Sequence, residues 1–512
     1  MCRRKPRDSA QVGGPAFPAV DRVGRRRGRV LLAIVVVAGL LHGCTLAPEY
    51  QPPPVAVPDN YRFASAEVEE TANTAWWRQL DDPVLDQLIA TALAANNNVR
   101  IATANVEQAL AVVTQTRSAL FPQVGYGASG ARDRIPETGV AGMIPNLPNP
   151  QETYQAMLSA SWELDLWGRI RSLSEAAQAS MLATNEARRG VILTLVSSVA
   201  TSYITLRGLD EQLQVARQSL TAYAESVRIY ELQFKHGQTS QMTVAQARSQ
   251  YETAAARIPQ IELQIAQTEN VLSVLLGGNP EAIPRGKTIG ELHMPAVPAG
   301  LPSSLLERRP DLQQAEQVLI AANAQIGAAR ALYFPSISLT GAYGSVSSDL
   351  SDLFKGPARS WSYAGQVTGP LFTFGAVSGQ VAQAEAAQRA AVASYELAVE
   401  SAFADVDNAL AARQKLGEQL VAQQRLVAAL QDYSRLAQLQ YDAGYAPYST
   451  VLQAEQSLFP AQLALAELQA SVLSSAAVVY KAMGGGWVGE ADKMTGDTLS
   501  ESVAQPPAVP LF

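Results

Sequence analysis

Two long stretches of the chain carry apolar residues at steps of three and four positions. They cover residues 168–235 and 375–443 and contain no proline, and each continues past a glycine turn into a shorter stretch, 239–276 or 449–483. Steps of three and four are typical of a coiled-coil seam. A helix of about 68 residues is on the order of 100 Å long. That is too long for the core of a compact domain.

The predicted seam can be followed residue by residue. In the first half it passes through Leu209, Leu213, Ala216, Leu220, Tyr223, Val227, Tyr230 and Phe234, and resumes at Val244, Ala247, Tyr251, Ala254, Ile258 and Ile261. Shorter helices, at about 97–120 and 312–333, precede each long one. The two short helices of each half together approach the length of the long helix, so we expect them to lie along it tip to tail. The Pro-rich segments 48–95, 277–311 and 484–512 are expected around the middle of the helices.

Four shorter runs alternate between apolar and small or polar residues. They lie at 124–128 and 154–162, and again at 337–343 and 361–367. A period of two predicts β-strands, and about nine to eleven residues is the length of a tilted membrane strand. The segments between the paired strands, 132–153 and 345–360, are expected to be loops.

The two halves of the chain are copies of one unit. Phe121-Pro122 matches Phe334-Pro335, Trp167-Gly168 matches Phe374-Gly375, and Gly237 matches Gly444. The expected organisation is a signal peptide at 1–43, a lipid-anchored N-terminal segment at 44–95, a first repeat at 96–276, a linker at 277–311, a second repeat at 312–483 and a tail at 484–512.

Four strands are too few to close a barrel, and open sheet edges are not tolerated in lipid. Two copies would give eight strands with a filled interior, whereas three would give twelve and leave room for a channel. The expected fold class is therefore an α+β membrane protein. It is a trimeric 12-stranded β-barrel continuous with a long α-helical coiled-coil barrel, built from two internal repeats.

Composition narrows the class of function. The chain is 47% apolar and 17% charged, which excludes disorder, and its net charge of −7 makes nucleic acid an unfavourable partner. Two cysteines and three histidines cannot build a disulfide framework or a Cys/His zinc site. We expect no metal and no cofactor.

The N-terminal segment has the features of a secretory signal. A basic region at 1–29 precedes the apolar run Val30–Leu41, followed by His42, Gly43 and Cys44. Leu41-His42-Gly43-Cys44 resembles a bacterial lipobox, which implies that Cys44 is lipidated and becomes the first residue. The alternative is an ordinary signal with an incidental cysteine. The residue after Cys44 is Thr45 rather than aspartate, which in a lipobox implies sorting to the outer membrane.

Aromatic residues cluster where the predicted strands meet the helices. They are Phe121, Trp162, Trp167, Tyr333, Phe334, Phe372 and Phe374. Chain direction places all of them at the helix-side rim, where a membrane barrel carries an interfacial girdle. Ordinary core aromatics are the alternative.

The chain resembles a TolC-like outer-membrane factor of the lipoprotein branch that serves resistance–nodulation–division pumps. The resemblance rests on Trp162-Glu163-Leu164-Asp165-Leu166-Trp167-Gly168-Arg169, on Arg308-Arg309-Pro310-Asp311-Leu312, on the Phe-Pro pairs and on Lys481-Ala482-Met483-Gly484-Gly485-Gly486-Trp487. It implies a homotrimer in the outer membrane whose helical tunnel reaches a periplasmic adaptor and an inner-membrane pump.

The sequence does not support an enzyme. Arg285-Gly286-Lys287-Thr288 is similar to the end of a phosphate loop, but the glycine required at position 281 is a glutamate. Asp405 and Asp407 lie two residues apart on a predicted helix, hence on different faces. We interpret them as solvated or tunnel-lining charges.

The turns at Gly237 and Gly444 are the expected far tips of the helical tube, and in the family the closing groups lie there. The candidates are Tyr441, Asp442, Tyr445 and Tyr448, with Lys235 and His236 from the neighbouring hairpin. Partly exposed polar pairs contribute only about 0–1 kcal/mol each, which suits a gate that must open reversibly. The alternative is that these are surface residues of a tip that docks the adaptor.

The predicted function is passive export of small toxic compounds or drugs through the channel of a tripartite efflux system. Protein secretion of the type I class through the same fold is an alternative. A periplasmic coiled-coil adaptor or structural lipoprotein without a pore is another, but it has no use for four alternating strands. The sequence does not name the exported compound.

Overall fold

The computed structural model describes residues 46–58, 60–63, 75–136, 138, 148–295, 305–485 and 487–488. These residues form two compact units. A sheet unit contains residues 120–171 and 330–372, and a helical unit contains the described parts of 47–119, 172–329 and 373–512. The signal segment and Cys44 lie outside the described residues.

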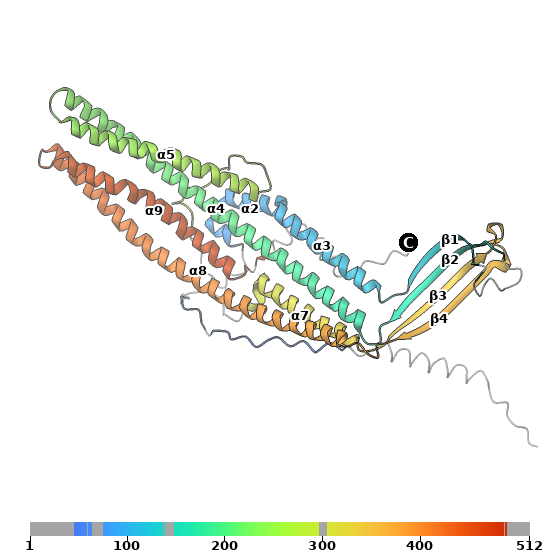
Figure 1. The fold of residues 1–512 in the computed structure, drawn as a ribbon. Coiled ribbons are helices and arrows are strands. Elements are labelled where there is room, and N and C mark those ends of the chain that lie inside the picture. Colours follow the sequence, from blue (N-terminus) through green and yellow to red (C-terminus); the bar gives the residue numbers. More distant parts are fainter. Residues whose placement is uncertain are drawn as a thin grey trace, which may run out of the picture. The chain divides into compact units, whose positions relative to one another are not determined.

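The sheet unit is one antiparallel sheet of four strands in the order β1-β2-β3-β4 (Figure 1). The strands are β1 (Gln123–Asp133), β2 (Gln151–Leu164), β3 (Ser336–Ser347) and β4 (Arg359–Thr368). They are 10 to 14 residues long, which is enough for a tilted strand to cross a bilayer. Two single-turn 3₁₀ helices, η4 (Leu350–Asp352) and η5 (Gly356–Ala358), connect β3 to β4.

The helical unit contains two pairs of long and short helices. The long helices are α4 (Arg169–Lys235) and α8 (Ala376–Asp442), and they turn back into α5 (Gln241–Leu275) and α9 (Tyr448–Ala482). α3 (Asn97–Ser118) and α7 (Pro310–Ala331) precede the strands, and α6 (Leu305–Arg308) is a single turn. Figure 1 shows both turns at the same end of the helical unit.

Corresponding helices of the two halves have equal lengths. α4 and α8 each have 67 residues, α5 and α9 each have 35, and α3 and α7 each have 22. The strand pairs β1–β2 and β3–β4 occupy the same place in each half. The duplicated architecture predicted from the sequence is therefore present in the fold.

The short helices of the first half lie along α4 tip to tail, as the lengths predicted. Val106 and Val113 of α3 share a buried cluster with Met181 of α4, whereas α5 packs on the later part of α4. Asn96 joins the ends of α3 and α5. Its side chain accepts hydrogen bonds from the first amides of α3 and donates one to the carbonyl of Leu275, at 2.8 Å, at the end of α5.

The seam residues of the sequence pattern are largely the buried ones. Leu209, Ala216 and Tyr223 of α4 form one cluster with Ala254 and Ile261 of α5. Phe234 is an exception, because it lies at the last turn of α4 and is about half exposed. The period of the pattern thus identified the contact between the two helices of the hairpin.

The segment before residue 96 is more ordered than its proline content suggested. It forms η1 (Trp76–Leu80) and α2 (Pro83–Ala95). Pro83 occupies the first helical position, where proline is favoured, and Asp82 caps the helix by accepting a hydrogen bond from the amide of Val84. Trp76 stacks on Tyr480 of α9 with 5.2 Å between ring centroids, so this segment belongs to the largest core of the helical unit.

Candidate functional site

The register of the sheet gives it one apolar face. Tyr126 lies opposite Leu158, Leu158 opposite Tyr343, and Tyr343 opposite Trp361, so one apolar row crosses all four strands. Directly opposed residues point to the same face. The face also carries Val124, Ala160, Trp162, Leu339, Tyr363 and Val367. Tyr126 is 90% exposed in the single chain, so this face has no cover within the described residues.

The opposite face of the sheet consists mainly of small and polar residues. It carries Gln123, Gly125, Gly127, Ser129, Gln155, Ser159, Ser161, Thr340, Ala342, Gly344, Ser360, Ser362 and Gln366. Gln155 donates a hydrogen bond to the hydroxyl of Ser129 at 2.8 Å across the β1–β2 pair. A sheet with one apolar and one polar face can separate lipid from water.

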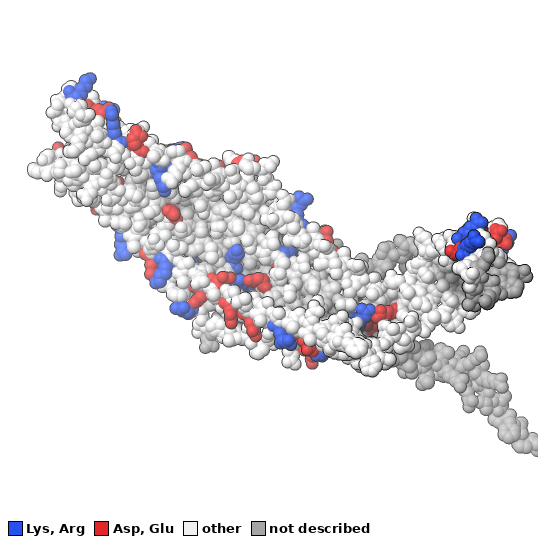
Figure 2. Space-filling model, in the orientation of Figure 1, with Lys and Arg blue, Asp and Glu red and all other residues white. Residues whose placement is uncertain are grey.

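Charged residues avoid the middle of the strands. Those in the strands, such as Arg132, Glu152, Glu163 and Arg359, lie close to strand ends. Figure 2 shows charged side chains gathered at the loop end of the sheet, with none over the middle of the strands on the visible face. An uncharged band of this kind is what the hydrocarbon core of a membrane requires.

The predicted girdle residues lie at the end of the sheet where the strands meet the helices. The indole of Trp162 donates to the carbonyl of Leu120 at 2.9 Å, and that of Trp167 donates to the carbonyl of Pro335 at 2.8 Å. Trp167 stacks on Phe334 at 4.6 Å, and Phe121, Phe372 and Phe374 are exposed. Their role in a membrane interface stays a prediction.

The charged residues of the Trp162–Arg169 motif stabilise the N-terminus of the helix that follows, α4. The carboxylate of Asp165 accepts hydrogen bonds from the amides of Ile170 and Arg171 at the first turn of α4. Glu163 forms a two-point ion pair with Arg169, at 2.9 Å. These contacts stabilise the short connection between the end of β2 and the first turn of α4.

Both helical hairpins turn through a glycine in the left-handed region. Gly237 has φ of 75° and Gly444 has φ of 77°. In each turn an amide beyond the glycine returns to a carbonyl in the last turn of the long helix, from Gln238 to Gln233 and from Tyr445 to Gln440. Since other residues rarely adopt this conformation, the glycines fix where the hairpins reverse.

Three tyrosines hold the two hairpin tips together. Tyr230 of α4 lies 4.3 Å from Tyr448 of α9 and 5.9 Å from Tyr441 of α8, measured between ring centroids. The hydroxyl of Tyr441 donates to the side-chain oxygen of Gln233 on α4 at 3.4 Å. Burial raises the pKa of Tyr441 and Tyr448, so both hydroxyls stay neutral at physiological pH.

The structure divides the gate candidates into two groups. Tyr448 is only 6% exposed and belongs to the tip core, so within one chain it packs rather than lines a passage. Tyr445 is 87% exposed, and Lys235 and His236 are also exposed. Asp442 accepts a hydrogen bond from Gln438 of its own helix, at 2.9 Å, and among the described residues it accepts none from the neighbouring hairpin. The predicted contact between hairpins is instead made by Tyr441, and sequence reasoning missed its partners Tyr230 and Gln233.

The linker segment Arg285–Thr288 is a docking point rather than a phosphate loop. The amide of Lys287 and the hydroxyl of Tyr203 both donate to Asp82, and the amide of Gly286 donates to Tyr203. Arg285 forms ion pairs with Asp210 and Glu269. These contacts tie the linker to α4, α5 and the cap of α2. The Gly286-Lys287 pair is therefore explained by packing, because its backbone amides bond to Tyr203 and Asp82.

The motif Arg308-Arg309-Pro310-Asp311-Leu312 also has a structural role. Arg309 is buried and its guanidinium binds Asp311, Asp405 and the carbonyl of Ala482. Asp407 accepts a hydrogen bond from the amide of Arg62. Asp405 is more than half exposed and Asp407 about a quarter exposed, as expected of solvated charges, but each also pairs with a segment remote in sequence.

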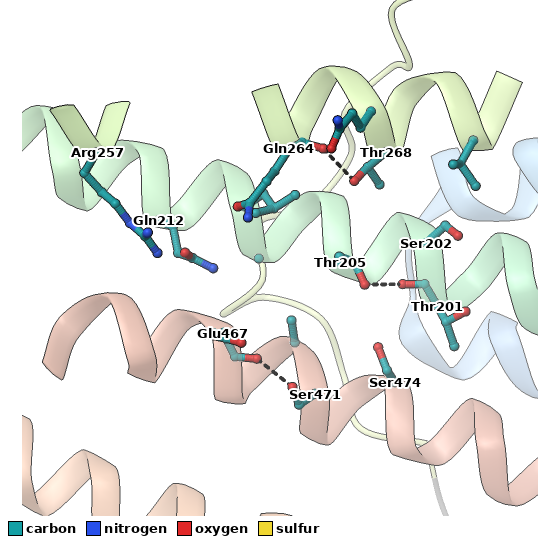
Figure 3. A pocket seen from close by; sticks show the side chains of 15 residues that line it. Thr201, Ser202, Thr205, Gln212, Arg257, Gln264, Thr268, Glu467, Ser471 and Ser474 are labelled. Carbon is teal, nitrogen blue, oxygen red and sulfur yellow. Dashed lines mark hydrogen bonds between the residues drawn. The ribbon is translucent and has the colours of Figure 1, made fainter. Parts of the chain in front are cut away.

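A groove of about 700 Å³ lies between α4, α5 and α9 (Figure 3). Its hydroxyl side chains mostly return to their own helix: Thr205 donates to the carbonyl of Thr201, Thr268 to that of Gln264 and Ser471 to that of Glu467. These hydroxyl groups therefore bond within their own helices, and the lining mixes polar side chains with apolar ones such as Leu209 and Val271.

The comparison with known proteins decides the family. The family model described as "Outer membrane efflux protein" matches residues 88–278 and 301–485. The chain belongs to this family. The two matches fall on the two halves of the fold, and they agree with the duplication seen in the helices and strands.

Relatives and solved structures agree with the family. The chain is 40% identical over 469 residues to the antibiotic efflux pump outer membrane protein ArpC of Pseudomonas putida, covering 89% of this chain and 96% of the relative. It is 36% identical over 457 residues to the cation efflux system protein CusC of Escherichia coli O6:H1, covering 88% of this chain and 97% of the relative.

A similar solved structure is the open state of the MtrE outer membrane channel of Neisseria gonorrhoeae. It has a TM-score of 0.78 and 33% identity, and the match covers 87% of this chain and 99% of that one. The TolC-like fold predicted from the sequence is thereby confirmed. The chain is the outer-membrane channel component of a tripartite efflux system, with a periplasmic helical part, and it is not an enzyme.

Proposed function

We propose that three copies of this chain form one closed channel through which small toxic compounds, such as antibiotics, leave the cell passively. The observation that carries the proposal is the sheet, which has one apolar face, one polar face and two open edges, β1 and β4. Unpaired backbone groups in lipid cost several kcal/mol each. Both edges therefore need a partner.

The strand order supports closure by identical copies. Four consecutive antiparallel strands leave β1 and β4 running in opposite directions, so β4 of one copy can pair with β1 of the next in the same antiparallel pattern. Three copies give a barrel of twelve strands, which is wide enough to hold water. The polar face, rich in serine, glycine and glutamine, would then line the channel.

Partners follow from the position of the helices and from the relatives. We propose that the tips at Gly237 and Gly444 meet a periplasmic adaptor bound to an inner-membrane pump of the resistance–nodulation–division class. We propose that the tip, held closed by the ring contacts of Tyr230, Tyr441 and Tyr448, opens when the adaptor binds. The relative named for antibiotic efflux is somewhat more similar than the one named for cation efflux, which favours organic compounds over metal ions as cargo.

Anchoring through Cys44 completes the proposal. The residue follows an apolar signal run, and the described chain from Leu46 onward contains no other cysteine. Two membrane attachments, a lipid and a barrel, would then hold each copy.

The experiment compares Leu158→Arg with Ser159→Arg, and measures native mass in detergent. Leu158 lies on the apolar face and Ser159 on the polar face of the same strand. Arginine at mid-membrane on a lipid face costs about 2–4 kcal/mol, whereas the channel side tolerates charge. We expect the wild type and Ser159→Arg to be trimers and Leu158→Arg to assemble poorly. A wild-type mass of one or two chains contradicts the trimer, and equal assembly of both variants contradicts the assignment of the faces.

A further inference from the structure

Glu455 is a half-buried carboxylate of α9, close to the hairpin tips. One of its carboxylate oxygens, Oε2, has no exposed surface and no hydrogen-bond partner among the described residues. On its own helix, α9, the buried side chains of Leu452 and Phe459 lie one turn away on either side. A buried carboxylate without a partner is costly when it is charged.

Tyrosines of the neighbouring helix complete the surroundings. Tyr223 of α4 lies 6.3 Å from Phe459, and Tyr230 of α4 lies 4.3 Å from Tyr448, so Glu455 stands between two ring contacts that join α4 to α9. Burial raises the pKa of Glu455 from 4.5 to about 7. Burial likewise raises the pKa of Tyr223, Tyr230 and Tyr448, which keeps their hydroxyls neutral.

Burial is the only cause of the raised pKa of Glu455, so no charged group among the described residues of the packed helices compensates it. On α5 the residue at the equivalent place in the first repeat is Arg248, which pairs with Glu231 of α4 at 2.5 Å. On α8, Arg435 pairs with Asp432. The residue equivalent to Glu231 in the second repeat is Gln438, and its amide donates to Asp442. The second hairpin therefore has an uncompensated acid where the first has an ion pair.

We propose that the protonation of Glu455 switches the tip between a packed and a loosened state. With its proton the side chain fits the apolar layer between α4 and α9, and the two hairpins stay packed. When the proton leaves, the charge requires water, and the contacts of Tyr230 and Tyr223 with α9 must separate to admit it. This regulation rests on the proposed function, because it acts on the tip that closes the channel.

The sign of the effect follows from proton binding. The packed state holds the proton up to about pH 7, whereas a solvated glutamate releases it near 4.5. Because the packed state binds more protons, raising the pH favours the loosened state. Between pH 5.5 and 8 the ratio of loosened to packed tips should rise on the order of tenfold.

The test combines Glu455→Gln with Glu467→Gln, a matched change at an exposed acid on the same helix. Single-channel conductance in planar bilayers is measured at pH 5.5 and 8, and hydrogen exchange of peptides spanning 441–459 is measured at both values after correction for intrinsic rates. We expect the wild type and Glu467→Gln to conduct more and exchange faster at pH 8. Glu455→Gln, which mimics the protonated form, should keep low conductance and slow exchange at both pH values.

Each outcome separates the switch from the channel. If Glu455→Gln keeps the pH response of the wild type, or if the wild type has none, the switch is wrong and the channel assignment stands. If no variant forms pores, the proposed function fails. The exchange data still decide whether Glu455 controls the tip, because that measurement needs no conducting pore.

Discussion

Asp82 serves several partners at once in the helical unit. Its carboxylate caps α2 through the amide of Val84, and it accepts from the hydroxyl of Tyr203 and the amide of Lys287. Only 1% of the residue is exposed. A buried carboxylate is tolerable when several donors surround it, so these donors hold the linker against α4.

Removing the hydroxyl of Tyr203 should release the linker. Tyr203→Phe leaves the amide of Gly286 without its acceptor and Asp82 without one donor, at a cost of about 1–3 kcal/mol. We expect faster tryptic cleavage after Arg285 and Lys287. Tyr223→Phe is the control, since its hydroxyl has no hydrogen bond among the described residues. Equal cleavage of both variants would contradict the role of the hydroxyl.

Among the elements, the two hairpins have equal lengths but different tip chemistry. The second tip supplies Tyr441 and Tyr448, whereas the equivalent residues of the first are Phe234 and Gln241. The contact between hairpins is made by the tyrosine rings and by one long hydrogen bond to Gln233. Weak contacts of this kind can separate reversibly.

Opening the tip should follow from removing the ring of Tyr441. Tyr441→Ala combined with Asp442→Ala deletes ring contacts that contribute about 0.5–1.5 kcal/mol each and the side chain that holds Gln438. We expect higher single-channel conductance and greater sensitivity of cells to large antibiotics. Tyr441→Phe keeps the ring and should stay close to wild type. Glu152→Gln, at the loop end of the sheet, should change neither readout; a leak in that variant alone would place the constriction elsewhere.

Helices and strands were predicted well from the sequence wherever the spacing of apolar residues kept one period along the whole element. The bounds of α4 and α8 followed from a seam without proline, and the faces of the strands followed from alternation. No helix was predicted within the Pro-rich segment 48–95, so α2 was missed, although an aspartate before a proline is also a helix start. The pairing of Asp405 with Arg309 and the burial of Tyr448 could not be predicted, because each depends on a contact between segments remote in the chain.

On the scale of the whole molecule, attachment to the membrane has two sources in the proposal. We expect mass spectrometry of the mature N-terminus to find lipidated Cys44. Cys44→Ser should lose the lipid yet still assemble, because the barrel supplies its own hold on the membrane. An unmodified N-terminus, or cleavage at another residue, would contradict the anchor.

The junction at Asn96 has a mechanical consequence. Because α3 and α5 meet end to end along α4, the long helix is supported by a second helix over most of its length. The joint combines the hydrogen bond of Asn96 with the apolar packing of Val99 and Leu272 in one core cluster. The two short helices therefore brace α4 as two segments with separate packing clusters that meet at Asn96, so a change in how α5 packs on α4 need not alter how α3 packs on it.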